Sequence, residues 1–254
     1  MENIITVDIG NTNITAGVFK SGHLCAKVKI PTHHYSLYGP GFKNLFKKAD
    51  LKLKNGSIEI IVSSVVPIAL GRLVMHLNKI AKCKILILGR DRKAPIKNLY
   101  RIKNEVGQDR LVNAYAAKIL YGAPAVIIDF GTAITFDLVS KKGDYLGGLI
   151  LPGIGISLAS LYEKTALLPK VELKDAPHII GRDTANSMRA GILYGFGAMC
   201  DGLVSRYRKV LGRPLKVIAT GGNAELIKKY SDSIQILDED IILKGLYLIS
   251  RSKR

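Results

Sequence analysis

Two short segments of this chain combine an aspartate, a glycine and hydroxyl side chains at the end of a β-rich run. They are Asp8-Ile-Gly-Asn-Thr12 and Asp129-Phe-Gly-Thr132. A glycine lets the backbone approach a phosphate closely, and Asn and Thr side chains can donate hydrogen bonds to phosphate oxygens. An aspartate at such a place can hold Mg²⁺, directly or through water, because hard cations require oxygen ligands. For one segment alone, the alternative is an ordinary hairpin turn, in which Asp, Gly and Asn are common.

Both segments stand in the middle of the same predicted structure. Residues 4–19 and 125–139 each consist of two β-rich stretches on either side of the Asp-x-Gly segment, a pattern typical of a β-hairpin. Two such hairpins, one in each half of the chain, can face each other across a cleft and clasp one polyphosphate. The pair therefore favours phosphate binding. The chain has no Walker P-loop, because its sequence contains no G-x-x-x-x-G-K-S/T motif.

Strands and helices alternate along the rest of the chain. Apolar β-branched runs predict strands over residues 58–66, 84–88 and 216–219. Helical spacing of apolar residues and flanking breakers predict helices over residues 67–81, 109–120, 155–168, 184–211, 225–230 and 241–250. This alternation predicts the α/β class, with one lobe in residues 1–120 and a second in residues 121–254.

The composition excludes several classes of protein. Of the 254 residues, 48% are hydrophobic and 23% are charged, unlike collagen-like, coiled-coil or wholly disordered chains. Cys25, Cys83 and Cys200 lie far apart without a C-x-x-C pair, which argues against a disulfide framework or a structural zinc site. No stretch has the pattern of a signal peptide, and glycines and a proline interrupt the longest uncharged run, residues 145–162. We expect a cytoplasmic protein without a membrane segment.

The net charge of +18 invites a comparison with nucleic-acid-binding proteins, which use basic surfaces to attract phosphates. However, the Lys and Arg residues are scattered in small groups, without a basic helix or an aromatic-interleaved stripe. A solvated basic surface is the interpretation that this scatter favours, and nucleic acid is not the partner we expect.

The duplicated hairpins resemble the phosphate-binding loops shared by actin, sugar kinases and the heat-shock chaperone ATPases. The resemblance implies two related ribonuclease H-like, actin-like ATPase lobes with a nucleotide cleft between them. Thr220-Gly-Gly222, between a predicted strand and a predicted helix, is similar to the adenosine-binding turn of that superfamily. The alternative for this third segment is a plain strand-to-helix turn.

Four motifs narrow the resemblance to one family, the type III pantothenate kinases. In chain order they are Asp8-Ile-Gly-Asn-Thr12, Gly107-Gln-Asp-Arg110, Asp129-Phe-Gly-Thr132 and Gly147-Gly-Leu-Ile-Leu-Pro-Gly153. Thr165-Ala-Leu-Leu-Pro169 and Gly181-Arg-Asp-Thr184 also look like the family, and the set covers most of the chain. The resemblance implies a homodimeric kinase that transfers the γ-phosphoryl group of ATP to pantothenate, the first step towards coenzyme A.

The resemblance also implies a role for each matching residue. Asp109 is the general base, Asp129 holds a monovalent cation, K⁺ or NH₄⁺, and Asp8 holds Mg²⁺. The residues expected to bind ATP and its phosphates are Asp8, Ile9, Gly10, Asn11, Thr12, Asn13, Ile14, Thr15, Thr132, Gly221 and Gly222. The residues expected to bind pantothenate are Tyr100, Gly107, Gln108, Asp109, Arg110 and Thr184.

Ordinary structural roles compete with some of these assignments. Asp109 and Thr184 stand where helices are predicted to begin, so each also fits a helix N-cap, and Tyr100 also fits a packing residue. The chain departs from the family at Lys103-Asn104, where many relatives have a proline, so the resemblance does not fix the path of that loop.

Two other functions are alternatives to the phosphorylation of pantothenate. One is a kinase of the same superfamily for another small alcohol, which the Gly107–Arg110 motif disfavours. The other is a regulator that associates with nucleic acid through its charge.

Overall fold

The computed structural model describes residues 3–51, 58–80, 83–176, 178–212 and 214–252. The chain divides into two compact units. The first contains Met1–Ile96, Arg101–Ala116 and Asp240–Arg254, and the second contains Lys97–Tyr100 and Ala117–Glu239. Both units combine one mixed five-stranded sheet with helices, so the predicted α/β class is confirmed.

The sheet of the first unit has the strand order β3-β2-β1-β4-β5. Its strands are β1 (Asn3–Ile9), β2 (Asn13–Lys20), β3 (His23–Pro31), β4 (Ile58–Ser64) and β5 (Cys83–Ile87). The strands β1, β2 and β3 are antiparallel neighbours, whereas β1, β4 and β5 are parallel. The carboxyl ends of three parallel strands therefore meet at one edge of this sheet.

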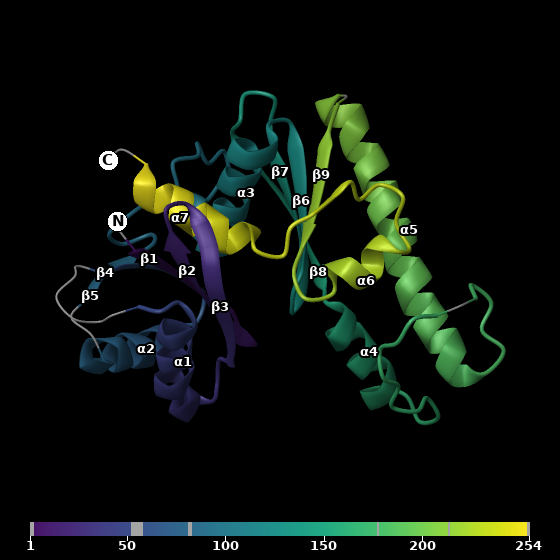
Figure 1. Cartoon of the computed structure of the whole chain (residues 1–254). Coiled ribbons are helices and arrows are strands. Elements are labelled where there is room, and N and C mark those ends of the chain that lie inside the picture. Colours follow the sequence, from purple (N-terminus) through teal and green to yellow (C-terminus); the bar gives the residue numbers. More distant parts are fainter. Residues whose placement is uncertain (1–2, 52–57, 81–82, 177, 213, 253–254) are drawn as a thin grey trace. The chain divides into compact units, whose positions relative to one another are not determined.

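Both faces of this sheet are covered along β1, whose four apolar residues, Ile4, Ile5, Val7 and Ile9, are all buried. Ile5, Val7 and Ile9 face a core formed with α1 (Tyr38–Lys48) and α2 (Pro67–Ile80), which lie side by side in Figure 1. On the opposite face, Ile4 joins a smaller core with residues of α3 (Gln108–Tyr121) and α7 (Ile241–Arg251). Thr6 and Asp8 share this second face with Ile4, because side chains alternate along a strand.

The second unit repeats the pattern of strands. Its sheet has the order β10-β9-β6-β7-β8, with antiparallel β6, β7 and β8 and parallel β6, β9 and β10. Its strands are β6 (Ala125–Phe130), β7 (Ala133–Val139), β8 (Tyr145–Pro152), β9 (Lys216–Thr220) and β10 (Ile236–Leu237). The helices α4 (Ile154–Glu163), α5 (Thr184–Leu211) and α6 (Ala224–Lys228) complete it, and α5 runs along the whole unit in Figure 1. In both units an Asp-x-Gly segment connects the first two strands, as predicted.

Local side-chain hydrogen bonds explain two elements that end earlier than predicted. The strand predicted to reach residue 66 ends at Ser64, whose hydroxyl accepts a hydrogen bond from Val66 N at 3.1 Å. The helix predicted to reach residue 168 ends at Glu163, and the hydroxyl of Thr165 donates to Leu161 O at 2.7 Å. That hydroxyl satisfies a carbonyl at the end of the helix. Residue 81, the predicted end of another helix, lies outside the described residues.

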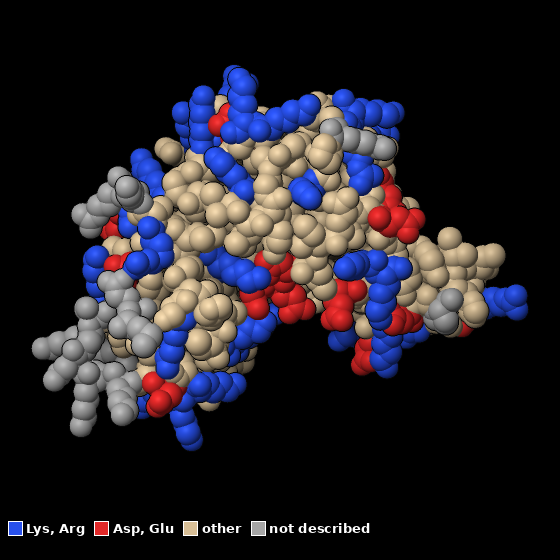
Figure 2. All heavy atoms as spheres, turned by 45° about the horizontal axis from the view of Figure 1, so that its top comes forward, with Lys and Arg blue, Asp and Glu red and all other residues tan. Residues whose placement is uncertain are grey.

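Among the described residues, no helix is both long and apolar enough to cross a membrane. The uncharged run of residues 145–162 forms most of β8 and α4 instead. Figure 2 shows Lys and Arg side chains on many separate parts of the visible face, with a few smaller groups of Asp and Glu.

Candidate active site

The turn between β1 and β2 presents two polar side chains to solvent. Gly10 N donates to Asn13 O at 3.0 Å, which closes the turn, and Asn11 and Thr12 are exposed. The buried Thr32 ties the backbone of the turn from the other side. Its hydroxyl donates to Gly10 O at 2.7 Å, and its N–H donates to Thr12 O at 2.9 Å. The turn is therefore braced at both of its ends, which suits a loop that must hold donors in fixed directions.

Asp8 lies just before this turn, half-buried, at the carboxyl end of β1. In the parallel pairing with β4 it stands beside Ser63, and Val65 N donates to Ile9 O at 3.1 Å. The hydroxyls of Thr6 and Ser63, on the same face of the sheet, are fully buried and have no hydrogen-bond partner among the described residues. Asp8 thus stands next to polar groups that retain hydrogen-bonding capacity.

The start of α3 packs against the ends of β4 and β5. A Cβ at Gly107 would lie 3.8 Å from Val65, the residue after β4, and a Cβ at Gly89 would lie 3.1 Å from the side chain of Gln108. Gly89 has a φ of +86°, which residues with a side chain rarely adopt, and the absence of a Cβ leaves room for the side chain of Gln108. The first unit therefore brings the Asp8 and Gly107–Arg110 motifs to the same edge of its sheet.

Asp109 lies within the first turn of α3, which begins at Gln108, so it is not the N-cap that its position suggested. Its Oδ1 accepts a hydrogen bond from Arg110 N at 2.8 Å and occupies the space that a side chain at Gly107 would need. Burial raises the pKa of the Asp109 carboxyl, and the hydrogen bond from Arg110 N and the nearby Arg110 charge oppose that rise. A half-buried carboxylate with a raised pKa is suited to accept a proton from a substrate hydroxyl.

In the second unit, two glycines pack closely against the turn that connects β6 and β7. A Cβ at Gly221, where φ is +91°, would lie 2.5 Å from Asp129 Oδ1, and a Cβ at Gly153 would lie 2.7 Å from Gly131 O and overlap Thr132 O. Asn223 N also donates to Phe130 O at 3.4 Å. The motifs around residues 129–132, 153 and 220–222, which are far apart in sequence, thus meet at this turn.

Tyr100 belongs to the second unit, although the residues on both sides of Lys97–Tyr100 belong to the first. Its ring lies 6.5 Å from that of Tyr145, measured between ring centroids, and a Cβ at Gly147 would lie 3.2 Å from it. The half-buried Tyr100 does pack against neighbours, and this packing orients the part of its side chain that remains accessible.

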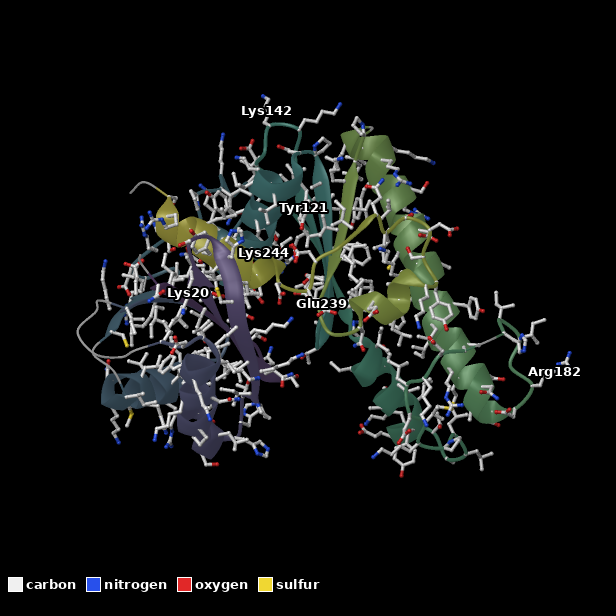
Figure 3. The ribbon with its side chains drawn as sticks, in the orientation of Figure 1. Lys20, Tyr121, Lys142, Arg182, Glu239 and Lys244 are labelled. Carbon is white, nitrogen blue, oxygen red and sulfur yellow. The ribbon has the colours of Figure 1, made fainter. Side chains whose placement is uncertain are left out.

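Thr184 is the exposed first residue of α5 and is not its N-cap. The N-cap is Asp183, which accepts a hydrogen bond from Asn186 N at 2.8 Å. Figure 3 shows Arg182 extending outward from the loop before this helix. The position of Thr184 is thus fixed by the start of α5, rather than by the turn that carries Asp129.

Sequence reasoning missed several residues that support these positions. Thr32 follows β3, a strand that was not predicted, and Asp137 and Tyr145 stand on strands in positions without a motif. An Asp within a mostly apolar strand, as at position 137, is the signal that could have pointed to Asp137 and its partner, because buried carboxylates need hydrogen-bond partners.

No group of three or more His, Cys, Asp or Glu side chains that could hold a metal ion occurs among the described residues. Mg²⁺ usually binds through one or two carboxylates together with substrate phosphates and water, so a protein cage is not required. Asp8, beside the exposed Asn11 and Thr12 and the buried hydroxyls of Thr6 and Ser63, fits such a site.

Comparison with known proteins places these motifs in one family. A family model described as type III pantothenate kinase matches residues 4–206. The type III pantothenate kinase of Bacillus cytotoxicus is 41% identical over 250 residues, covering 97% of this chain and 95% of that protein. That of Myxococcus xanthus is 39% identical over 249 residues, covering 97% of both chains.

A solved structure supports the fold. Component A of the (R)-2-hydroxyglutaryl-CoA dehydratase of Acidaminococcus fermentans matches with a TM-score of 0.55 and 14% identity over 97% of each chain. At this identity the match bears on the fold alone, and it agrees with the expected actin-like ATPase fold. The family model and the two curated relatives, taken together with the motifs described above, show that this chain belongs to the type III pantothenate kinase family.

Proposed function

We propose that this protein transfers the γ-phosphoryl group of ATP to the primary hydroxyl of pantothenate, which gives 4′-phosphopantothenate and ADP. This is the first step of coenzyme A synthesis. The single observation that carries the proposal is the near full-length identity of about 40% to two type III pantothenate kinases. The meeting of the Asp8 and Gly107–Arg110 motifs at one sheet edge supports it.

Asp109 is the general base of the proposed reaction. Its carboxylate takes the proton of the primary hydroxyl while the hydroxyl oxygen forms a bond to the γ-phosphorus, and the bond between that phosphorus and the β–γ bridging oxygen breaks. Gly107 leaves the space in which this carboxylate lies, and Gln108 and Arg110 flank it. We assign Gly107, Gln108 and Arg110, with Tyr100 and Thr184 of the second unit, to pantothenate binding.

The β1–β2 turn and the β6–β7 turn are the proposed contacts to ATP. Gly10 allows close approach of phosphate oxygens, and the exposed Asn11 and Thr12 donate hydrogen bonds to them. The remaining residues of that hairpin and of the second unit assigned to ATP are Asp8, Ile9, Asn13, Ile14, Thr15, Thr132, Gly221 and Gly222. Bound Mg²⁺ would neutralise charge on the phosphates, and Asp8 is the residue that would hold it.

Asp129 is the residue we assign to a monovalent cation, K⁺ or NH₄⁺. The packing of Gly221 against its Oδ1 supports this, because the carboxylate is held at the turn rather than directed freely into solvent. A monovalent cation there would offset phosphate charge without requiring strict octahedral geometry.

A homodimer and a cytoplasmic location complete the proposal. Gly191, Gly195 and Gly202 of α5 have open space where a Cβ would lie, whereas Gly197 packs against Tyr230 of the same chain. The first three leave a stretch of α5 on which a second helix could pack closely. The cytoplasm is where the ATP that the reaction consumes is available.

Product analysis tests the acceptor directly. The purified protein, with ATP, Mg²⁺, K⁺ and pantothenate, is expected to give a phosphomonoester on the primary hydroxyl, identified by phosphorus-proton coupling in NMR spectra. A pantothenate analogue without that hydroxyl should give no product. Phosphorylation of another small alcohol in preference to pantothenate would overturn the proposal in favour of a different kinase of this superfamily.

A further inference from the structure

Tyr145, at the start of β8, holds the segment that carries Tyr100. Leu99 N donates to Tyr145 O and Tyr145 N donates to Lys97 O, both at 2.9 Å. The segment Lys97–Tyr100 therefore lies along Tyr145 as a short strand would. The rings of Tyr100 and Tyr145 also contact each other, with an angle of 35° between their planes. The backbone of Tyr145 thus fixes the position of the segment that ends at Tyr100, and the ring of Tyr145 helps to fix the orientation of the Tyr100 ring.

The ring of Tyr145 is in turn fixed by a buried carboxylate. Its hydroxyl donates to Asp137 Oδ1 at 2.8 Å, and the hydroxyl of Thr135 donates to Asp137 Oδ2 at 2.9 Å. Tyr145 and Asp137 are both fully buried. Both hydroxyls donate to the same carboxyl group, and water does not compete for a buried pair. The Tyr145 ring is therefore held at both its backbone and its hydroxyl end.

Gly147 completes the support of Tyr100. Its φ of +118° is rarely adopted by other residues, and a Cβ there would lie 3.2 Å from two ring carbons of Tyr100. The ring consequently lies against the backbone of Gly147 as well as near the ring of Tyr145. Both supports come from the same strand, β8.

The same face of the sheet also carries Asp129. In the β6–β7 pairing, Asp129 stands opposite Thr135, whose hydroxyl reaches Asp137. Asp129, Thr135 and Asp137 thus share one face of the sheet. The hydrogen bonds from Thr135 and Tyr145 explain how a carboxylate can be buried on β7.

We propose that Tyr145, oriented by Asp137, is a positioning residue that sets the affinity for pantothenate by holding Tyr100 in its binding orientation. The proposal rests on the proposed function and adds to it a determinant that touches neither substrate. Tyr145 acts through Tyr100, so its loss affects pantothenate binding and leaves ATP binding as it is.

The test is steady-state kinetics of Tyr145→Phe, which retains the ring and removes the hydroxyl. The KM for pantothenate is expected to rise about five- to ten-fold, because one buried hydrogen bond is lost, while kcat and the KM for ATP change less than about two-fold. Asp137→Asn is the second variant and is expected to shift the same constant. Tyr121→Phe is the matched control. The hydroxyl of Tyr121, labelled in Figure 3, donates to Asp238 Oδ2 at 2.6 Å in the same unit, and its loss should leave the KM for pantothenate unchanged.

A double-mutant cycle distinguishes positioning from a general effect on folding. In a Tyr100→Ala background, Tyr145→Phe is expected to cause no further rise in the KM for pantothenate. Additive effects would overturn the proposal, and so would an unchanged KM in Tyr145→Phe when the wild-type protein is active. Loss of folding in both Tyr145→Phe and Asp137→Asn would assign the pair a structural role only and also overturn it. A wild-type protein that does not turn over pantothenate would instead overturn the proposed function itself.

Discussion

Asp109 experiences opposing influences on its charge. Burial disfavours the carboxylate and raises its pKa, whereas the hydrogen bond from Arg110 N and the Arg110 side chain favour it. Its place in the first turn of α3 also favours a negative charge, because the helix dipole is positive there. The net result is a raised pKa, the property expected of a base that must take up a proton during the reaction.

Asp109→Asn is expected to lower kcat by about 10² to 10⁴-fold, because the amide cannot take the proton of the attacking hydroxyl. The measurement is ADP release under saturating ATP and pantothenate. Glu105 is exposed and lies four residues earlier in the chain, so Glu105→Gln serves as a control for the loss of a negative charge nearby. If the folded Asn variant kept near-normal turnover, the base would have to be another residue.

The raised pKa also predicts the acid limb of the pH profile. The base acts as the carboxylate, so activity falls as the pH decreases through the pKa of Asp109. That fall should occur at a higher pH than for an ordinary aspartate with a pKa of 3.8. The profile of kcat/KM for pantothenate measures it, and a limb at or below the ordinary value would contradict the assignment.

The same burial predicts a gain in stability when the charge is removed. The folded-state pKa lies above the unfolded value, so ionisation of Asp109 costs folding free energy at pH values above that pKa. Asp109→Asn should therefore unfold at a higher temperature than the wild type near neutral pH, and the difference should shrink as the pH falls. Thermal unfolding followed by circular dichroism at several pH values checks this. A variant that is less stable at neutral pH would argue against the buried charge.

At the scale of elements, the β1–β2 turn depends on Thr32, which follows β3. Thr32→Val keeps the shape of the side chain and removes the hydrogen bond to Gly10 O. We expect the KM for ATP to rise several-fold and the stability to fall by about 1 kcal/mol. Ser250→Ala, which removes a hydroxyl that donates to Tyr247 O at 2.7 Å in α7, is the matched control. An equal change in the KM for ATP in both variants would show that Thr32 has no specific role in ATP binding by this turn.

The second turn depends on Gly221 in a comparable way. Gly221→Ala forces a left-handed backbone conformation on alanine and places a Cβ against Asp129. It should lower stability by about 1 kcal/mol or more and weaken activation by K⁺. Gly71→Ala, in the exposed part of α2 with open space around it, should instead raise stability slightly. Unchanged K⁺ activation in a folded Gly221→Ala variant would contradict the role of Asp129.

Most elements could be predicted from the sequence, and the exceptions have physical reasons. The helix over residues 184–211 is correct at both ends, because Asp183 caps it and Gly212 follows it. The strand β3 was missed because Lys27 and Lys29 interrupt its apolar residues, so it contains no long apolar run, and β8 was missed because glycines and a proline interrupt it. The helix α1 was missed because Gly39, Pro40 and Gly41 interrupt its first turn.

The sequence predicted those residues of the candidate site that belong to motifs. It did not predict the residues that hold the motifs in position. The motifs led to Asp8 and Asp129, which lie near the carboxyl ends of β1 and β6, and to Asp109, which lies in the first turn of α3. Thr32 acts through a hydrogen bond to a turn 22 residues earlier in the chain, and Tyr145 acts through a hydrogen bond to Asp137 on the neighbouring strand β7. Pairing register decides such contacts, and a single sequence does not state it.

At the scale of the whole molecule, the chain contains the same arrangement of strands twice, and an Asp-x-Gly turn lies at the same place in each. The predicted lobe boundary near residue 120 stays a prediction. The C-terminal helix α7 packs with β1 in the first unit, so a compact unit need not be one continuous stretch of sequence.

The open glycine face of α5 predicts an oligomer. The wild-type protein should have twice the chain mass in sedimentation or light-scattering measurements, and Gly195→Arg should reduce this to one chain mass while the protein stays folded. Gly71→Arg, on the exposed face of α2, is the control for an added charge. A wild-type monomer at micromolar concentration would contradict the proposed homodimer.

The measurement that tests the central claim most directly is ADP release by the purified protein with ATP and Mg²⁺, with and without pantothenate, in potassium, ammonium and sodium buffers. The account predicts turnover that requires pantothenate and that is supported by potassium or ammonium but not by sodium. ADP release that is indifferent to pantothenate, or no release from a folded protein that binds ATP, would contradict it.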